Sequence, residues 1–217
     1  MIEFYNVHTK IDNSVILNNI TFRILKGEFV FLKGSSGAGK STILRHIYMD
    51  LYPNQGMVIV ENYSSAKISD KEIPFLRRKL GVIFQDFKLL SDRNVFDNVA
   101  FALRVTGAKS NEIKRKVMRV LTEVNLGQKR NMYPSELSGG EQQRVAIARA
   151  IINNPFIILA DEPTGNLDTK TSVEIMEILE KINRQGTAVL MATHSQEILK
   201  KYKHRTLTTE NGILEKE

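Results

Sequence analysis

One segment restricts the possible folds of this chain more than any other. Residues 34–41 read Gly-Ser-Ser-Gly-Ala-Gly-Lys-Ser, between a predicted strand over 28–32 and a predicted helix over 42–49. They match the pattern G-x-x-x-x-G-K-[ST] at every defined position, in the strand–loop–helix context that the pattern requires. Glycines let the backbone wrap closely, so that successive N–H groups and the positive end of the helix point at an anion. The segment therefore predicts a phosphate-binding loop in an α/β fold.

This loop gives the first set of candidate nucleotide contacts. The Lys40 amine would reach the β- and γ-phosphates, and the Ser41 hydroxyl would bind magnesium. A plain glycine turn before a helix is the alternative, and it leaves Lys40 and Ser41 unexplained. The predicted phosphate-binding residues are Gly34, Ser35, Ser36, Gly37, Ala38, Gly39, Lys40, Ser41 and Thr42.

The rest of the chain divides into three kinds of pattern. Short strands are predicted over 2–7, 20–25 and 28–32, which makes the opening rich in β structure. Residues 92–153 show helical periodicity and read as a helical insert. Apolar strands over 156–160 and 187–192 then alternate with helices over 171–182 and 196–202, which predicts a parallel sheet covered on both faces.

Polar residues stand directly after the apolar segments. Asp161 and Glu162 end one strand, His194 follows the next by two residues, and Gln85 follows the apolar residues 82–84. Alpha/beta proteins bind ligands at the carboxyl ends of their strands. Asp161 could hold magnesium and Glu162 could polarise an attacking water. Taken alone, two acids after a strand are an ordinary loop and His194 a surface residue; the phosphate loop upstream favours the functional interpretation.

A second anion site is predicted where residues 137–143, Leu-Ser-Gly-Gly-Glu-Gln-Gln, begin a helix. A helix start presents free N–H groups to an anion. Ser138 as an ordinary N-cap is the alternative. That alternative accounts for the serine but leaves Gly139 and Gly140 unexplained.

Charge and composition limit the classes of partner that this chain could bind. Lys plus Arg exceed Asp plus Glu by 31 − 24 = +7, which admits a nucleotide, a nucleic acid or an acidic membrane face. No helix-turn-helix or basic recognition arm supports a nucleic-acid partner. There are no cysteines, so a disulfide framework or thiolate metal site is excluded. No apolar run approaches the roughly 18 residues of a membrane span, and the first residues lack a secretory pattern.

These motifs, in this order and over essentially the whole chain, resemble the ATP-binding subunits of ABC transporters. The Leu-Ser-Gly-Gly segment is the family signature, residues 165–168 match its D-loop, and Gln85 and His194 match its Q-loop and switch histidine. The resemblance implies a P-loop NTPase fold of the ABC type in one domain, residues 1–217. That fold has a mixed, mainly parallel sheet core, an N-terminal antiparallel β-subdomain and an inserted helical subdomain at residues 92–153.

The resemblance also implies a mechanism with ATP and Mg2+. Two copies would sandwich ATP, the loop of one being completed by the signature of the other, with contacts from Ser138, Gly139, Gly140 and Glu141. Glu162 would be the general base, His194 would contact the γ-phosphate, and Gln85 would link magnesium and water to a partner. The implied catalytic residues are Glu162, His194, Lys40 and Gln85, and the implied magnesium ligands are Ser41, Gln85 and Asp161.

Within the family, residues 75–78, 81–90, 94–100 and 190–194 resemble the cell-division ATPases. This implies an FtsX-like integral membrane partner, a peripheral position on the cytoplasmic side of the cell membrane, and control of cell-wall hydrolysis. Residues 160–168 are shared with lipoprotein-release and macrolide-export ATPases, which stay the alternative. A clamp that binds ATP with little hydrolysis is a third possibility, and Glu162 argues against it.

The sequence departs from the family pattern where adenine would stack. Ile11 stands at the position of the usual aromatic residue, and Tyr5 is expected to pack within its strand. We therefore expect apolar contact with the base from Ile11 or Val15. An Asn-Lys-x-Asp guanine reader is missing from the sequence, which disfavours a GTPase.

Overall fold

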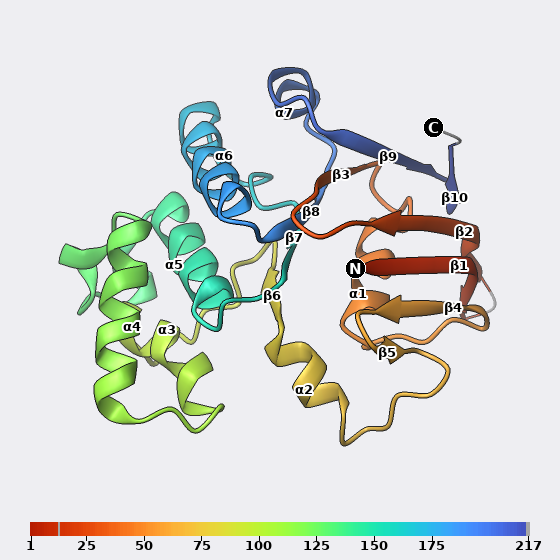
Figure 1. Cartoon of the computed structure of the whole chain (residues 1–217). Helices are drawn as coiled ribbons and strands as arrows, with labels where there is room; N and C mark the ends of the chain where they lie inside the picture. The colour runs from red at the N-terminus through yellow and green to blue at the C-terminus, as the bar shows by residue number, and fades with distance from the viewer. Residues whose placement is uncertain (13, 216–217) are drawn as a thin grey trace.

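The computed structural model describes residues 1–12 and 14–215, which form two sheets flanked by helices (Figure 1). The first sheet has the order β2-β1-β4-β5, with antiparallel pairing throughout. Its strands are β1 (Ile2–Ile11), β2 (Ser14–Ile24), β4 (Gln55–Val60) and β5 (Tyr63–Ser64). Side chains alternate along β1, and Phe4 stacks on Phe22 of β2 with 4.5 Å between ring centroids. The antiparallel β-subdomain is confirmed, although β4 and β5 were not predicted.

The second sheet is the parallel core, with the order β10-β9-β3-β8-β7-β6. Only the β9–β10 pair is antiparallel among the described strands of this sheet. Its strands are β3 (Phe29–Lys33), β6 (Leu80–Ile83), β7 (Ile157–Asp161), β8 (Ala188–Thr193), β9 (Arg205–Glu210) and β10 (Ile213–Leu214). The sequence did not predict β9, because three threonines and two charged end residues give it a weak apolar pattern.

Alternating side chains send the parallel strands into two cores. Phe29 and Phe31 of β3 join the core formed with the helices that follow β6, whereas Val30 and Leu32 join the core shared with the antiparallel sheet. Both faces of the sheet are thus buried, which is why its strands are almost wholly apolar. The predicted sheet covered on both faces is confirmed.

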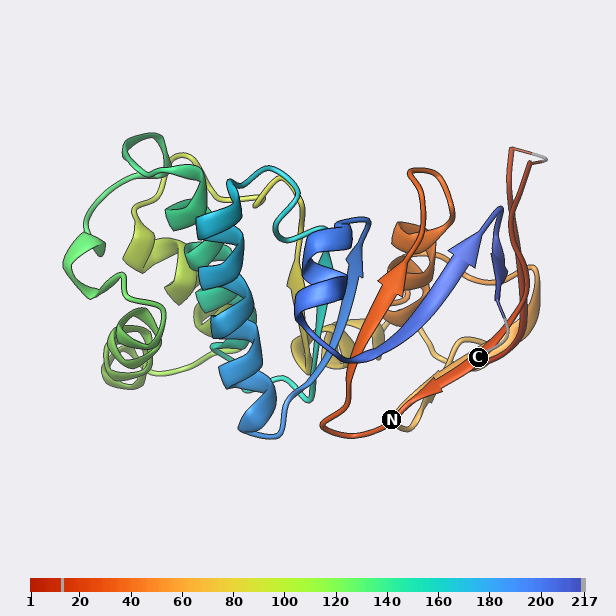
Figure 2. The ribbon, with the colours of Figure 1, turned by 90° about the horizontal axis from the view of Figure 1, so that it is seen from above.

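The helices form two sets (Figures 1 and 2). One set lies at the β6 end of the parallel sheet and packs against β6 through its last helix, and Figure 2 shows α6 alongside this set. Its members and the shorter turns among them are α3 (Val95–Arg104), α4 (Ser110–Glu123), η1 (Gly127–Lys129), η2 (Pro134–Glu136) and α5 (Gly139–Ile151). The others are α1 (Lys40–Ile47), α2 (Ile73–Arg78), α6 (Thr169–Arg184) and α7 (Gln196–Lys201). Within the described residues, no helix is long and apolar enough to cross a membrane.

The topology brings distant segments to one edge of the parallel sheet. Lys33 pairs with Thr193, Asp161 with Ala192, and Ile83 with Ala160, so four parallel strands end side by side. The chain leaves those ends into the glycine loop, His194, Glu162 and Gln85. Parallel pairing therefore places all four predicted motifs along a single edge.

Candidate nucleotide-binding and hydrolysis site

The glycine loop is held against its neighbours at two points that exclude a larger residue. A Cβ on Gly34 would lie 2.5 Å from the carbonyl oxygen of Thr209. Gly39 has a φ of +94°, and a Cβ there would lie 2.6 Å from Cδ2 of Leu17. The buried Thr209 hydroxyl also donates to the Ala38 carbonyl at 2.9 Å. Sequence reasoning missed Thr209, because nothing in the weak β9 pattern connects it to the loop. The fold of the loop thus depends on β2 and β9 as well as on its own glycines.

Helix α1 begins directly after this loop without a side-chain cap and without an acidic residue in its first turn. Its first N–H groups therefore stay available to an anion, and the helix dipole adds a positive potential. Lys40, the first residue of the helix, is only 5% exposed, and its amine donates to the carbonyls of Gly34 and Ser35 at 2.9 Å each. A buried ammonium and uncapped N–H groups make this end of the sheet strongly attractive to phosphate.

Ser41 and Asp161 meet across the gap between α1 and β7. The Ser41 hydroxyl stands close enough to the Asp161 carboxylate to favour its charged form. Burial raises the pKa of Asp161, the neighbouring Glu162 adds to the rise, and Ser41 and Lys40 oppose it. A carboxylate with a raised pKa gains from a cation that stabilises its charged form. Hard oxygen donors of this kind suit Mg2+.

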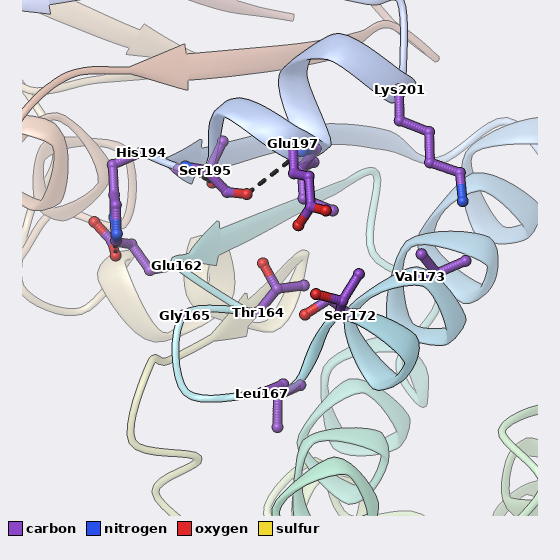
Figure 3. A pocket seen from close by; sticks show the side chains of 13 residues that line it. Glu162, Thr164, Gly165, Leu167, Ser172, Val173, His194, Ser195, Glu197 and Lys201 are labelled. Carbon is purple, nitrogen blue, oxygen red and sulfur yellow. Dashed lines mark hydrogen bonds and ion pairs between the residues drawn. The ribbon is translucent and has the colours of Figure 1, made fainter.

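Glu162 connects Lys40 to the predicted switch histidine. Its Oε1 lies 3.2 Å from the Lys40 amine. Its Oε2 lies 2.7 Å from Nδ1 of His194, and Figure 3 shows these two side chains together. The backbone of Glu162 has a φ of +47°, which non-glycine residues rarely adopt, and its N–H donates to the Ala192 carbonyl at 3.0 Å. An unusual backbone conformation fixed by a β8 carbonyl is typical of a side chain held for function.

A cavity of about 360 Å³ lies directly behind Glu162 and His194. Figure 3 shows Thr164, Ser172 and Glu197 pointing into it from the loop after β7, from α6 and from α7. Their hydroxyl and carboxylate groups make the cavity wall next to Glu162 partly polar. The candidate base therefore stands between the glycine loop and a partly polar cavity.

Gln85 stands at the same sheet edge, two residues after β6, but its side chain is exposed. Among the hydrogen bonds and ion pairs of the described residues, none joins Gln85 to Lys40, Asp161, Glu162 or His194. The structure thus brings the other five predicted catalytic and metal-binding residues together and leaves Gln85 at the rim.

The signature residues lie at the start of α5, next to α6 and the loop before it. A Cβ on Gly140 would lie 2.4 Å from Cγ2 of Thr171, and one on Gly139 would lie 3.5 Å from Leu167. The starts of α5 and α6 therefore pack so closely that position 140 must be glycine. This accounts for Gly140, which the N-cap interpretation left unexplained. The Ser138 hydroxyl accepts from the Glu141 N–H at 3.3 Å as an N-cap.

The Glu141 carboxylate is committed to its own helix. It accepts from the Ser138 N–H at 3.0 Å and pairs with the Lys129 amine at 2.5 Å, and this lysine is the main reason that the pKa of Glu141 is lowered. A contact between Glu141 and nucleotide stays a prediction, with the backbone N–H groups of the helix start as the remaining donors.

Two expectations about the base-binding region have different outcomes. Tyr5 was expected to pack within its strand, and this is wrong: Tyr5 is 45% exposed because Phe4 takes the inward position of β1, and its hydroxyl donates to Glu3. Ile11 ends β1 half-buried, and Val15 on β2 is 54% exposed. The contact of either residue with adenine stays a prediction.

Comparison with known proteins agrees with this geometry. Residues 17–165 match the ABC transporter family. A dimeric bacterial ABC transporter cassette superimposes with a TM-score of 0.89 at 37% identity, covering 100% of this chain and 97% of the other. A dimeric ATP-binding cassette in a post-hydrolysis state with ADP and Pi gives the same TM-score at 36% identity, with the same coverage. Fold and site therefore define an ATPase cassette.

Curated relatives narrow the assignment. The cell division ATP-binding protein FtsE of Bacillus subtilis (strain 168) is 52% identical, over 99% of this chain and 94% of the relative. FtsE of Mycobacterium tuberculosis (strain ATCC 25618 / H37Rv) is 51% identical, over 91% and 86%, and FtsE of Escherichia coli (strain K12) is 46% identical, over 91% and 89%. The chain belongs to the ABC transporter family, and within it to the FtsE group. The family resemblance predicted from the motifs is confirmed.

Proposed function

We propose that this chain binds ATP with Mg2+ at residues 34–42, hydrolyses it with Glu162 as general base, and drives an FtsX-like membrane partner in cell division. The observation that carries the proposal is that Glu162 lies 3.2 Å from Lys40 and 2.7 Å from His194, which stand in sequence-distant segments. The whole chain acts as one ATP-binding domain, with residues 92–153 as its inserted helical subdomain.

The chemistry is positioning and charge neutralisation, as in other phosphoryl transfers. The backbone N–H groups of the loop and of the first turn of α1 hold the phosphates, and Lys40 neutralises charge on the β- and γ-oxygens. Glu162 accepts a proton from the attacking water. His194, already joined to Glu162 through Nδ1, orients that carboxylate and presents its ring to the γ-phosphate side.

The residues present fit a magnesium ion only in combination with nucleotide. Within residues 1–12 and 14–215, no group of three or more His, Cys, Asp or Glu could form a metal site by itself. Ser41 and Asp161 supply two adjacent oxygen donors, and Gln85 stands at the rim as a third. Phosphate oxygens would complete the shell, as is usual for Mg2+ in such enzymes. When bound, the ion would offset negative charge on the phosphates.

Dimerisation around ATP follows from the placement of the signature. Ser138, Gly139 and Gly140 begin α5, on the side of the molecule occupied by the helices that follow β6 (Figure 1). Nucleotide held by one subunit would meet this helix start on a second copy. The proposal is supported by the dimeric cassettes that share the fold.

The partner would bind at a groove of about 520 Å³ between the sheet and the helices after β6. Its walls combine apolar side chains with arginines, among them Phe84, Val105, Arg77, Arg78 and Arg149. An amphipathic segment on the cytoplasmic side of a membrane protein suits such a surface, which would make the chain a peripheral protein of the cell membrane. The FtsE relatives favour an FtsX-like partner and cell-wall control; a lipoprotein-release or macrolide-type exporter is the alternative.

The partner is tested by placing a photo-crosslinking residue at Val105, which is 55% exposed at the groove, and identifying the adduct from cells. An FtsX-like membrane protein is the expected product, and a lipoprotein-release or macrolide permease would move the assignment to the alternative. The matched control places the same residue at Ile213, 51% exposed on β10 away from the groove, where no such adduct is expected.

A further inference from the structure

The segment between β6 and α3, residues 84–94, is fastened at its far end by one buried side chain. Asn98 of α3 is fully buried, and its Oδ1 accepts from the Leu90 N–H at 2.8 Å. Its Nδ2 donates to the carbonyls of Leu90, Arg93 and Asn94 at 3.0, 2.8 and 3.0 Å. Residues 90–94 are therefore attached to α3.

The middle of the same segment is held by Arg149 from α5. Its Nη1 donates to the Lys88 carbonyl at 2.5 Å, and its Nη2 donates to the Phe87 carbonyl at 2.8 Å. Phe87 and Lys88 have φ angles of +59° and +47°, in the left-handed region that such residues rarely adopt. Two consecutive residues in this conformation present both carbonyls to a single guanidinium, whose planar fork is suited to binding two acceptors at once.

The surroundings of Arg149 suit a side chain that holds this segment in place. Among the described residues, no acidic side chain forms an ion pair with Arg149. The guanidinium instead donates to the carbonyls of Phe87 and Lys88. Arg149 is half-buried, and this burial lowers the pKa of its guanidinium. A half-buried guanidinium that donates to two backbone carbonyls holds those carbonyls in place.

We propose that Arg149 is a positioning residue that, together with Asn98, binds residues 87–94 to the helices, so that Gln85 moves when these helices move relative to the sheet. The short connection 84–86 is then the hinge, because β6 ends at Ile83 and the first clamped residue is Phe87. This inference rests on the proposed function for its effect on catalysis, and the clamp itself stands on the geometry alone.

The position of Arg149 links the clamp to the partner groove. Arg149 lines that groove beside Phe84, at the hinge, and Ala102 of α3. A partner segment bound in this groove would contact Arg149 itself. Docking would thereby change the placement of Gln85 without contacting the nucleotide.

The test compares Arg149→Met and Arg149→Lys with the unmodified chain by amide hydrogen exchange and steady-state ATP hydrolysis. In Arg149→Met, exchange in the peptide covering 84–90 should rise about tenfold or more, because local opening is no longer opposed by the two side-chain bonds. Turnover should fall about tenfold, with the Kd for ATP changed less than about twofold, since misplaced rather than lost groups slow the reaction. Arg149→Lys keeps the positive charge but lacks the planar guanidinium. Its exchange in 84–90 and its turnover should lie between those of Arg149→Met and the unmodified chain.

Arg104→Met is the matched control, because Arg104 lies on α3 and its 2.6 Å ion pair with Asp97 is outside the segment. It should leave exchange in 84–90 unchanged. Unchanged exchange in 84–90 for Arg149→Met, or an equal rise in the peptide covering α1, would overturn the clamp. If the unmodified chain did not hydrolyse ATP, the proposed function would fail, while the exchange result would still decide the clamp.

Discussion

Glu162 and His194 follow different strands of the parallel sheet, and their side chains meet at 2.7 Å between Oε2 and Nδ1. The other oxygen of Glu162 lies 3.2 Å from the Lys40 amine, so one carboxylate connects the phosphate loop to the end of β8. This arrangement supports our proposal that Glu162 is the general base of ATP hydrolysis.

Replacing Glu162 by Gln should lower the turnover number by about 10²–10⁴-fold, the usual contribution of a general base. ATP affinity should be retained, because Lys40 and the loop N–H groups are untouched. The stalled ATP complex should then accumulate as a dimer, measured by light scattering with and without ATP. Glu197→Gln, in the wall of the cavity behind the site, is the control and should turn over normally. Unimpaired hydrolysis in Glu162→Gln would remove the general-base assignment.

Replacing Lys40 by Met should weaken ATP binding by roughly 10 to 150-fold, the equivalent of about 1.5–3 kcal/mol for hydrogen bonds to a charged group. Lys40 is 5% exposed, and its loss also leaves the Gly34 and Ser35 carbonyls without their donor. Titration calorimetry with ATP measures the change. Arg45→Met, on the same helix but in a surface pair with Asp50, should leave affinity intact. Equal affinities for the Lys40 variant and the unmodified chain would contradict the role of this amine.

The capping role of Glu141 predicts a graded loss of stability. Glu141→Ala removes both the reciprocal bond to the Ser138 N–H and the Lys129 pair, and should lower the free energy of unfolding by about 1–2 kcal/mol. Glu141→Gln keeps an oxygen that can accept from Ser138 and should lose less. Lys129→Met removes only the half-exposed ion pair and should cost at most about 1 kcal/mol. Denaturant unfolding orders the three variants, and a Gln variant as unstable as Ala would exclude the cap as the cause.

The buried His46 predicts a loss of stability at mildly acidic pH. Burial is the main cause that lowers the pKa of His46 in the folded chain, and its ring bonds the Leu51 carbonyl through Nδ1 at 2.9 Å and the Thr9 hydroxyl through Nε2 at 2.7 Å. Because a carbonyl only accepts, Nδ1 carries the proton, and the neutral ring accepts from Thr9 at Nε2.

The direction in which stability changes with pH follows from proton uptake by His46. The unfolded chain protonates this histidine near pH 6.5, whereas the folded chain does so only at lower pH. Stability from His46 is therefore complete above about pH 6.5 and declines as pH falls toward the folded pKa, by at most about 1.4 kcal/mol per pH unit. When the free energy of unfolding is measured between pH 7.5 and 5, His46→Gln should lack the part of the decrease that His46 causes. Parallel pH profiles for the two proteins would be the contrary result.

Local sequence predicted the parts of the site that are contiguous in the chain. The glycine loop between strand and helix and the acids at the end of an apolar strand are each specified by residues a few positions apart, as is the Ser138 cap, which the sequence offered as the alternative to an anion site. Apolar runs likewise predicted β3, β7 and β8, because strands buried on both faces need apolar side chains at every position. Fold class and family followed from these motifs in order.

Only the tertiary structure decided which distant groups touch. Thr209 supports the loop from β9, Thr171 sets the need for Gly140, and Arg149 binds the carbonyls of Phe87 and Lys88. Each contact joins residues far apart in the chain, and at least one partner in each is a backbone atom or a small side chain with no recognisable sequence pattern. Strand order and register, fixed by the packing of both faces of the sheet, determine these distances, and no local pattern encodes them.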